Sequence, residues 1–373
     1  MSYFDLFKQT VLANSDKPVI ADSDARRTLS YCQLDELSGK IAAKLSALKC
    51  KKGDAVIVRL GRKAEFIAAE LGVMKLGCAA VPILPSYPQE RVDYISRDCK
   101  AELIIEEDFF GDIDSFASIE PVETDPNDRA MIIYTSGSTG KPKGVVYSSR
   151  AFEAAVERMK AHLENISPLV FAAVGNLTFV ASVLEYFTVL SLGGCTHILS
   201  DEARVDIGKI QDYYAENRIT AGFLSPRVLK LYKNSDKYLK VIITASERLV
   251  DAYSADYTIY NSYGQSETIG TVMSFKVDRE YDNTPIGTAV KGVKAFLIDS
   301  EGNEIDGGEG ELCVQGVFAE EYLNKPEETA KTFKKLPNGE VVIRTGDIAE
   351  KLPDGNFVYI NRKDWMVKIN GQR

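Results

Sequence analysis

The chain has 373 residues, of which 45% are hydrophobic and 27% charged, and its formal net charge is −9 at pH 7. The length predicts two or three subdomains, and the composition is that of an ordinary soluble globular protein. The acidic balance argues against nucleic acid or an anionic membrane as a partner, because either would need a basic face.

No segment has the layout of a signal peptide or a membrane span. Residues 1–17 lack a basic-then-apolar pattern, and the apolar run 179–192 is interrupted by Glu185. The cysteines form no CxxC pair, which is typical of reduced thiols and predicts a cytoplasmic location. His162 and His197 have no clustered Cys or His companion, so we interpret both as structural rather than as parts of a zinc site or a Ser-His-Asp triad.

Predicted helices and strands alternate through the first third of the chain. Apolar residues three and four apart predict a helix over about 31–48, and a second helix is expected over 63–76. Short buried strands are expected at 55–58 and 79–83. Such alternation is typical of a parallel sheet covered by helices.

A loop rich in glycine, hydroxyl and lysine side chains follows a predicted buried strand. Residues 134–144 read Tyr-Thr-Ser-Gly-Ser-Thr-Gly-Lys-Pro-Lys-Gly. Glycines allow backbone N–H groups to close on an anion, hydroxyls add donors and lysines add charge, so the loop suits phosphate. The spacing excludes a mononucleotide P-loop, because only Ser138 and Thr139 separate Gly137 from the next Gly-Lys pair. The alternative interpretation is a solvated Ser/Gly turn.

The rest of the chain divides into an α/β part and a β part. A helix is expected from residue 151, and strands at 219–224, 241–245 and 257–261 end near polar residues. Ligands collect at such carboxyl ends of parallel strands. From about residue 271, short β-like pieces separated by Asp, Gly and Asn predict a small antiparallel, barrel-like subdomain.

The loop and several later motifs together resemble the adenylate-forming superfamily, which contains acyl-CoA synthetases, luciferases and the adenylation domains of nonribosomal peptide synthetases. The later motifs are Asn-Ser-Tyr-Gly-Gln-Ser-Glu-Thr at 261–268, the segment 310–333, Arg-Thr-Gly-Asp at 344–347 and Arg-Lys-Asp at 362–364. The sequence is most similar to a peptide-synthetase adenylation domain, over about 28–373. It departs from the family pattern at Ser266 (usually Thr), at Glu320 and Glu321 (usually Arg-Gly) and at Asn361 (usually Gly).

The resemblance implies an ATP site that uses Mg²⁺. Tyr263 would stack on adenine, Asp347 would bind the ribose hydroxyls, Arg362 would meet the ribose or phosphates, and Glu267 would hold the metal. The implied catalytic residues are Thr135, Lys143 and Glu267, and Asp364 is the implied hinge. The implied ATP-binding residues are Thr135, Ser136, Gly137, Ser138, Thr139, Gly140, Lys143, Ser246, Glu247, Ser262, Tyr263, Gly264, Ser266, Asp347 and Arg362.

The acid substrate is expected to lack an α-amine. Val180 stands where amino-acid-activating members have an Asp that pairs with the substrate ammonium, and a buried ammonium without its ion pair costs about 3–5 kcal/mol. The mostly apolar lining predicts a 2-keto, 2-hydroxy, aryl or branched acid. The implied lining residues are Phe179, Val180, Ala181, Leu184, Phe223, Ile243, Ala245, Ser262, Gly270 and Thr271.

The implied fold is α/β, with stacked, mostly parallel sheets flanked by helices (an αβαβα-type large lobe) and a small distorted β-barrel subdomain. The adenylation core is expected at 1–360, with α/β subdomains at about 1–270 and the β subdomain at about 271–345. Residues 361–373 are expected to be the hinge and the truncated start of a C-terminal lobe. The missing lobe would carry a charge-neutralising lysine, so the chain alone is expected to be impaired.

The implied reaction is ATP-dependent formation of an acyl-adenylate with pyrophosphate release. The acyl group would pass to a thiol, either the phosphopantetheine of a peptidyl or acyl carrier protein or CoA. The alternatives are an acyl- or aryl-CoA ligase, and a nucleotide-binding scaffold without turnover.

Overall fold

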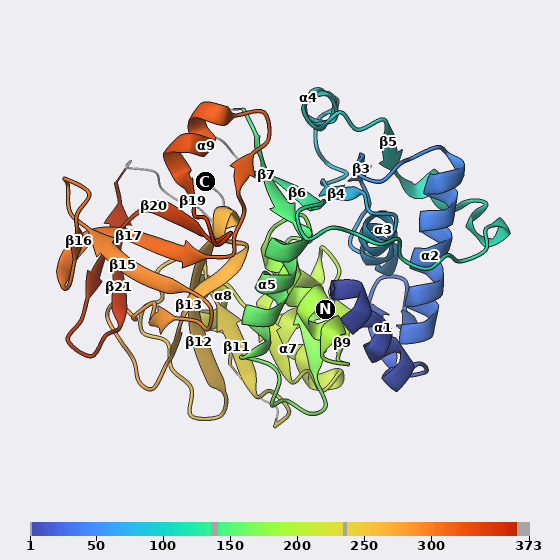
Figure 1. Ribbon diagram of the computed structural model, residues 1–373. Coiled ribbons are helices and arrows are strands. Elements are labelled where there is room, and N and C mark those ends of the chain that lie inside the picture. Colours follow the sequence, from blue (N-terminus) through green and yellow to red (C-terminus); the bar gives the residue numbers. More distant parts are fainter. Residues whose placement is uncertain (1, 136–140, 234–236, 364–373) are drawn as a thin grey trace.

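The computed structural model describes residues 2–135, 141–233 and 237–363, which form three β-sheets with helices between and around them (Figure 1). Two sheets are mostly parallel and the third is antiparallel. The predicted α/β class with a separate β part is therefore confirmed.

A six-stranded sheet is built mainly from the N-terminal part of the chain, in the order β18-β7-β6-β4-β3-β5. Its parallel centre, β5-β3-β4-β6, contains the strands predicted at 55–58 and 79–83. The strands are β3 (Ala55–Val58), β4 (Ala79–Pro82), β5 (Leu103–Ile105), β6 (Arg129–Thr135), β7 (Lys143–Ser148) and β18 (Glu321–Tyr322).

A nine-stranded sheet follows the order β14-β13-β12-β11-β10-β8-β9-β1-β2. The strands from β12 to β1 run parallel, and both edges are antiparallel. The strands are β1 (Pro18–Asp22), β2 (Arg27–Ser30), β8 (Val170–Ala173), β9 (Cys195–Ile198), β10 (Ala221–Phe223), β11 (Val241–Thr244), β12 (Thr258–Gln265), β13 (Gly270–Lys276) and β14 (Thr288–Ala289).

The antiparallel sheet corrects the expected limits of the β subdomain. The expected range was about 271–345, but β13 and β14 pair within the nine-stranded sheet, and the antiparallel sheet spans 294–362. The reason is topological, because a short turn at 266–269 returns β13 alongside β12, and strand periodicity does not reveal which partner a strand joins. The strands are β15 (Lys294–Ile298), β16 (Glu304–Ile305), β17 (Gly308–Gly316), β19 (Phe333–Lys335), β20 (Val341–Lys351) and β21 (Phe357–Arg362).

The helices begin where the sequence supplies caps. The hydroxyl of Ser30 accepts from the Gln33 N–H at 3.3 Å and the Gln33 side chain accepts from the Ser30 N–H at 2.9 Å, a capping box that starts α2. Ser148 caps α5 in a similar way. The helices are α1 (Tyr3–Asn14), α2 (Tyr31–Ala47), α3 (Ala64–Lys75), α4 (Gln89–Cys99), α5 (Ser149–Lys160), α6 (Val189–Ser191), α7 (Ile207–Glu216), α8 (Pro226–Leu231) and α9 (Pro326–Thr332).

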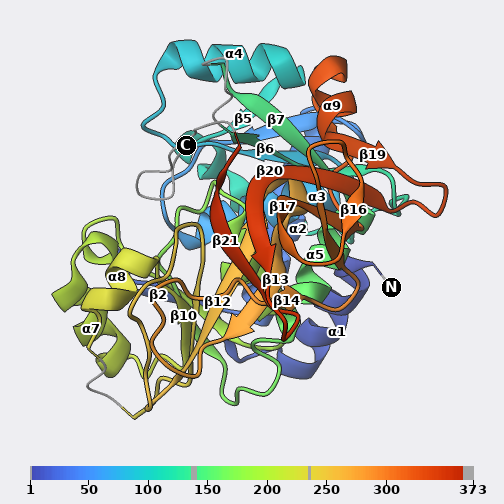
Figure 2. The same ribbon diagram turned by 90° about the vertical axis from the view of Figure 1, so that its left-hand side faces the viewer.

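The two large sheets are separated by helices and covered by others. α3 and α5 contact strands of both sheets, so they form a central layer. α4 packs on the outer face of the six-stranded sheet, and α7 and α8 pack on the outer face of the nine-stranded sheet. Figure 2 shows α4 at the top and α7 and α8 at the lower left, with β20 and β21 in front. This arrangement is the layered α/β architecture that was expected.

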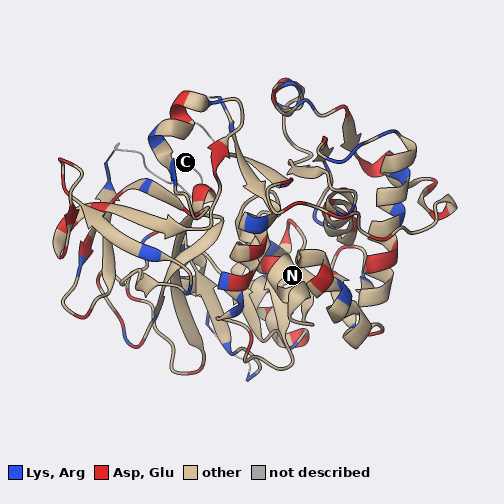
Figure 3. Ribbon diagram, viewed as in Figure 1, with Lys and Arg blue, Asp and Glu red and all other residues tan. Residues whose placement is uncertain are grey.

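Charged residues of both signs are interspersed along the elements in the view of Figure 3. Across the described part of the chain, none of the helices has the length and apolar character needed to cross a membrane.

Candidate active site

A cleft of about 870 Å³ opens where the carboxyl ends of β11 and β12 face β20 and β21. Strand ends of this kind collect ligands in open parallel sheets. Ser246, in the cleft wall, has a φ of 78°, a left-handed conformation that is uncommon outside glycine. The predicted ATP-binding residues that line the cleft are Ser246, Glu247, Ser262, Tyr263, Gly264, Asp347 and Arg362.

Asp347 is the centre of a buried polar network in the cleft wall. Its Oδ2 accepts from the Tyr263 hydroxyl at 2.5 Å and from Gln265 Nε2 at 2.7 Å, and its Oδ1 lies 3.1 Å from Arg362 Nη1. Gln265 Nε2 also donates to the Thr345 carbonyl at 3.0 Å, and the Asp347 N–H donates to the Thr345 hydroxyl at 3.1 Å. The carboxylate, which β20 carries, is thus fixed by side chains from β12 and β21.

The protonation of Tyr263 follows from this environment. Burial, and to a smaller extent the nearby Asp347, raises the pKa of Tyr263 well above its ordinary value. The phenol therefore stays protonated at neutral pH and continues to donate to Asp347. An aromatic ring beside a fixed carboxylate can bind the base and the ribose hydroxyls of a nucleoside.

A second cluster lies at the two ends of the predicted phosphate loop. Glu267, in the 3₁₀ turn Ser266–Thr268, is 2% exposed and accepts from the Tyr322 hydroxyl at 2.7 Å. Lys143 Nζ lies 4.2 Å from the centre of the Tyr322 ring, a cation–π contact. Thr135 pairs with Lys143 across β6 and β7, so the ends of the loop meet. The Thr135 Oγ1 is buried and has no hydrogen-bond partner among the residues described.

Part of the predicted phosphate site lies outside the residues that the structure describes. The loop positions 136–140 and the predicted hinge residue Asp364 fall outside the described residues. Tyr147 donates from its hydroxyl to the Ser266 carbonyl at 2.9 Å, which fixes the turn beside Glu267. Among the residues described, the cleft wall does not include Thr135, Lys143, Ser266 or Glu267.

The predicted acid-lining residues lie on neighbouring strands and on the segment after β8. Phe223 pairs with Ile243 across β10 and β11, and Thr271 pairs with Gly264 across β13 and β12. Val180 packs on the hydrophobic core that also contains Leu184 and Ile243. Phe179 and Ala181 are partly buried beside it, while Ala245 follows β11 and Gly270 opens β13.

Ser262 is the one predicted acid-lining residue that also lines the cleft, within the ranges that the structure describes. Its side chain is buried, and its Oγ has no hydrogen-bond partner among the described residues. Because Ser262 precedes Tyr263 on β12, the predicted acid and nucleotide residues adjoin at this strand.

Sequence reasoning missed three side chains that hold the site together. Gln265 and Tyr322 lie inside recognised motifs, and their position there was the available signal for a role. Arg158 gave no such signal, since it lies on the amphipathic α5 next to apolar positions. It is buried and donates to the carbonyl oxygens of Val317 at 3.0 Å and Thr268 at 2.9 Å, so it supports the turn that carries Glu267.

No three His, Cys, Asp or Glu side chains in the described ranges come together in a way that could hold a metal ion. A cation at Glu267 would therefore need oxygen atoms from a bound substrate. The buried carboxylate of Glu267, which contacts Tyr322 beside Lys143 of the predicted phosphate loop, fits that arrangement, because Mg²⁺ is usually held by one or two carboxylates plus phosphate oxygens.

The fold is α/β, and its cleft lies at the strand ends and is lined by several of the predicted ATP-binding residues. The family described as AMP-binding enzyme matches residues 7–320, and the chain therefore belongs to that family.

Named relatives agree with this assignment. Bacitracin synthase 1 of Bacillus licheniformis is 32% identical over 393 residues, covering 99% of this chain and 7% of that protein. The chain thus spans only a small part of that relative's length. The inhibitor-bound N-terminal domain of FACL13 from Mycobacterium tuberculosis has a TM-score of 0.86 at 22% identity, covering 97% of this chain and 99% of that one. NpsA-ThdA, an artificially fused adenylation–PCP di-domain NRPS from Klebsiella oxytoca, has a TM-score of 0.87 at 22% identity, covering 100% of this chain and 81% of that one. At this identity the structural likeness shows the fold.

Proposed function

We propose that this chain activates a carboxylic acid with ATP, forming an acyl-adenylate and releasing pyrophosphate, for thioester transfer to a carrier-protein phosphopantetheine. The observation that carries the proposal is the convergence of Tyr263, Asp347 and Arg362 on one cleft in a member of the AMP-binding enzyme family. These groups suit the base, the ribose and the phosphates of one nucleotide.

The protein's contribution to this reaction would be alignment of two anions and stabilisation of the charge that develops at the α-phosphorus. Tyr263 would stack on adenine, and Asp347 would accept hydrogen bonds from the ribose hydroxyls. Thr135 and Lys143, with the loop between them, would donate to the phosphates. Bound Mg²⁺ would neutralise phosphate charge, and Glu267, oriented by the Tyr322 hydroxyl, is the residue that would hold it.

The proposed acid lacks an α-amine. Val180 is partly buried against the apolar core, and it offers no charge to an ammonium group. Burying an unpaired charge costs several kcal/mol, so an α-amino acid should bind far more weakly than its keto or hydroxy counterpart. A 2-keto, 2-hydroxy, aryl or branched acid fits this lining.

A carrier protein is the acceptor we favour over CoA. Bacitracin synthase 1 matches nearly the whole chain, and the structural neighbour NpsA-ThdA joins an adenylation unit to a PCP. An acyl- or aryl-CoA ligase is the alternative function, and a nucleotide-binding scaffold without turnover is a second one. All six cysteines are free, which supports a cytoplasmic site of action.

The test uses matched acids that share a side chain and differ only at C2. Acid-dependent ATP–pyrophosphate exchange is measured in the full-length protein for the keto, hydroxy, unsubstituted and α-amino members of each set. We expect the α-amino acid to rank last by roughly a hundredfold, since about 3 kcal/mol is lost. Val180→Asp should move the preference toward the amine, and Val174→Ile, a conservative change on the same segment, is the control.

Three outcomes would count against parts of the proposal. A wild-type preference for a free α-amino acid over its deaminated twin would remove the proposed substrate class. Transfer of the acyl group to CoA and not to a carrier protein would favour the ligase. Nucleotide binding without exchange for any acid tested would favour the scaffold.

A further inference from the structure

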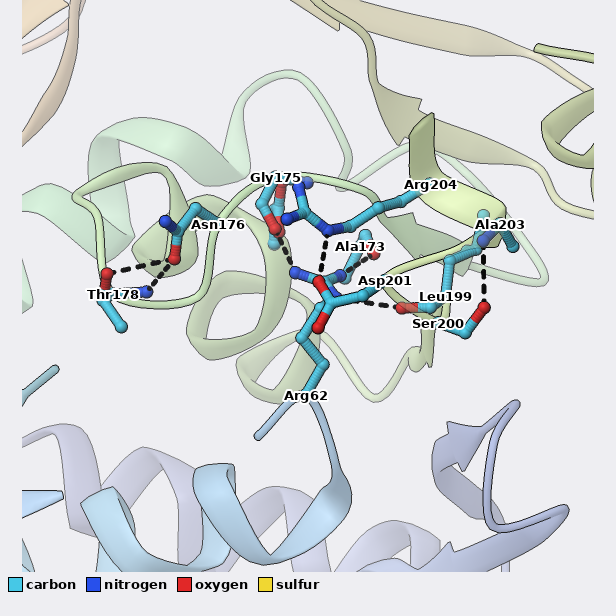
Figure 4. A network of polar contacts seen from close by, with 11 residues as sticks. Arg62, Ala173, Gly175, Asn176, Thr178, Leu199, Ser200, Asp201, Ala203 and Arg204 are labelled. Atoms are coloured by element: carbon cyan, nitrogen blue, oxygen red, sulfur yellow. Dashed lines mark hydrogen bonds and ion pairs between the residues drawn. The ribbon is translucent and has the colours of Figure 1, made fainter. Parts of the chain in front are cut away.

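The side chain of Arg62 is inserted among backbone carbonyl groups from two strand ends (Figure 4). Its Nε donates to the Leu199 oxygen at 2.9 Å, its Nη2 to the Ala173 oxygen at 2.6 Å, and its Nη1 to the Gly175 oxygen. Ala173 ends β8 and Leu199 follows β9. One guanidinium thus holds the chain where two neighbouring parallel strands end.

Glu185 holds Gly175 from the other side. Its Oε1 accepts from the Gly175 N–H at 2.7 Å, and the glutamate is fully buried. A Cβ on residue 175 would lie 2.2 Å from that oxygen, so any larger residue there would displace the Glu185 carboxylate from this contact. The N–H and the carbonyl oxygen of Gly175 are therefore both held by side chains, from Glu185 and Arg62 respectively.

The residues that carry Glu185 form a π-helical turn, Val183–Thr188, and this turn is tied to α3. The hydroxyl of Tyr186 donates to Glu70 Oε2 on α3. Short π-helical turns occur frequently at functional sites. Arg62 lies two residues before the first residue of α3, so both attachments of the segment lead to the same helix and the turn before it.

The proposed acid-lining segment lies between the two attachment points. From Gly175 the chain enters a turn in which Asn176 Oδ1 accepts from the N–H and the hydroxyl of Thr178, each at 3.0 Å. Val180 and Leu184 follow before the chain reaches Glu185. The positions of these acid-lining side chains thus depend on where Gly175 and Glu185 are held.

We propose that Arg62 and Glu185 are positioning residues for the acid substrate, holding the segment 175–185 so that Val180 and Leu184 face the acid. This proposal rests on the proposed function. Neither residue lines the nucleotide cleft. We call the contacts of Arg62 and Glu185 with Gly175 the clamp, and its loss should raise the KM for the acid and leave the KM for ATP unchanged. A purely structural role would instead lower stability or affect both substrates alike.

The experiment measures the KM values for acid and ATP separately in full-length variants. Arg62→Lys keeps the charge but cannot reach three carbonyl groups, so we expect the acid KM to rise at least tenfold and the ATP KM to stay within twofold. Glu185→Gln keeps an acceptor for the Gly175 N–H and should stay near wild type, whereas Glu185→Leu should resemble Arg62→Lys. Arg204→Lys is the matched control, because Arg204 lies beside Arg62 and pairs only with exposed Asp201 among the contacts shown (Figure 4).

A second measurement tests, independently of catalysis, whether the clamp holds the segment 175–185 in place. Hydrogen–deuterium exchange over 176–182 should speed up at least fivefold in Arg62→Lys and stay unchanged in Arg204→Lys. If Arg62→Lys does not fold, Asn176→Ala loosens the same segment without a buried charge and should show the same two effects. If wild type uses no acid, the proposed function fails, while exchange still reports on the clamp. Equal changes in both KM values, or unchanged exchange in Arg62→Lys, would overturn the proposal.

Discussion

Asp347→Asn tests the proposed nucleotide site directly, because this carboxylate accepts hydrogen bonds from Tyr263 and Gln265 and forms an ion pair with Arg362. The side chains of Arg362 and Asp347 are 9% and 3% exposed, so their pair is buried. Removing one partner of a buried pair costs about 3–5 kcal/mol, and we take about 3 kcal/mol because the amide still accepts hydrogen bonds. With about 2.1 cal/mol/K per residue for the unfolding entropy, that loss lowers the Tm by about 4 °C.

The same substitution should weaken nucleotide binding. A hydrogen bond to a charged acceptor contributes about 1.5–3 kcal/mol, so losing the charge opposite the ribose hydroxyls should raise the Kd for Mg-ATP about 10- to 100-fold. Isothermal titration calorimetry gives the affinity and thermal denaturation gives the Tm. Asp306→Asn is the control, because that carboxylate is 93% exposed and pairs with Lys351 away from the cleft.

Two results would refute this reasoning in different ways. A Tm that falls while the ATP affinity stays within twofold of wild type would make Asp347 a structural residue only. No change in either quantity would mean that the buried network contributes little. A weaker affinity in Asp306→Asn as well would indicate a general charge effect rather than a contact with the ribose.

Three further predictions concern single side chains. Burial raises the pKa of Glu70 from 4.5 to about 8, so between these pH values the folded chain holds a proton that the unfolded chain releases. The free energy of unfolding therefore falls as the pH rises from about 4.5 to about 8. Glu70→Gln should remove this pH dependence, and its Tm relative to wild type should be higher at pH 8.5 than at pH 5. Tyr322→Phe removes the hydrogen bond to Glu267 but keeps the ring beside Lys143. Losing that hydrogen bond costs about 1 kcal/mol, so the Mg²⁺ concentration that half-saturates ATP binding should rise about fivefold. An unchanged Mg²⁺ titration would contradict the proposed role of Glu267. Gly264→Ala would force a Cβ into the Gly270 carbonyl oxygen between β12 and β13, so ATP binding should be lost in calorimetry, while Gly61→Ala, which meets no atom within 4 Å, should bind normally.

The sequence determined the local structure and the kinds of chemistry present. Ser30 and Gln33 encode the start of α2 within four residues, and the helix and the strands predicted for the first third of the chain were confirmed at nearly the same positions. The motifs at 134–144 and 261–268 identified residue types suited to phosphate, base and metal. These inferences succeed because helix periodicity, capping and motif spacing involve residues that are close along the chain.

The tertiary structure alone decided which distant groups meet. It joins Gln265 to Asp347 and Arg62 to Gly175, pairs separated by 82 and 113 positions in the chain. It also assigns β13 to the nine-stranded sheet, which moved the expected limits of the β subdomain. Such contacts depend on strand order and crossover connections, and a short stretch of sequence carries information about its own conformation but not about its partner.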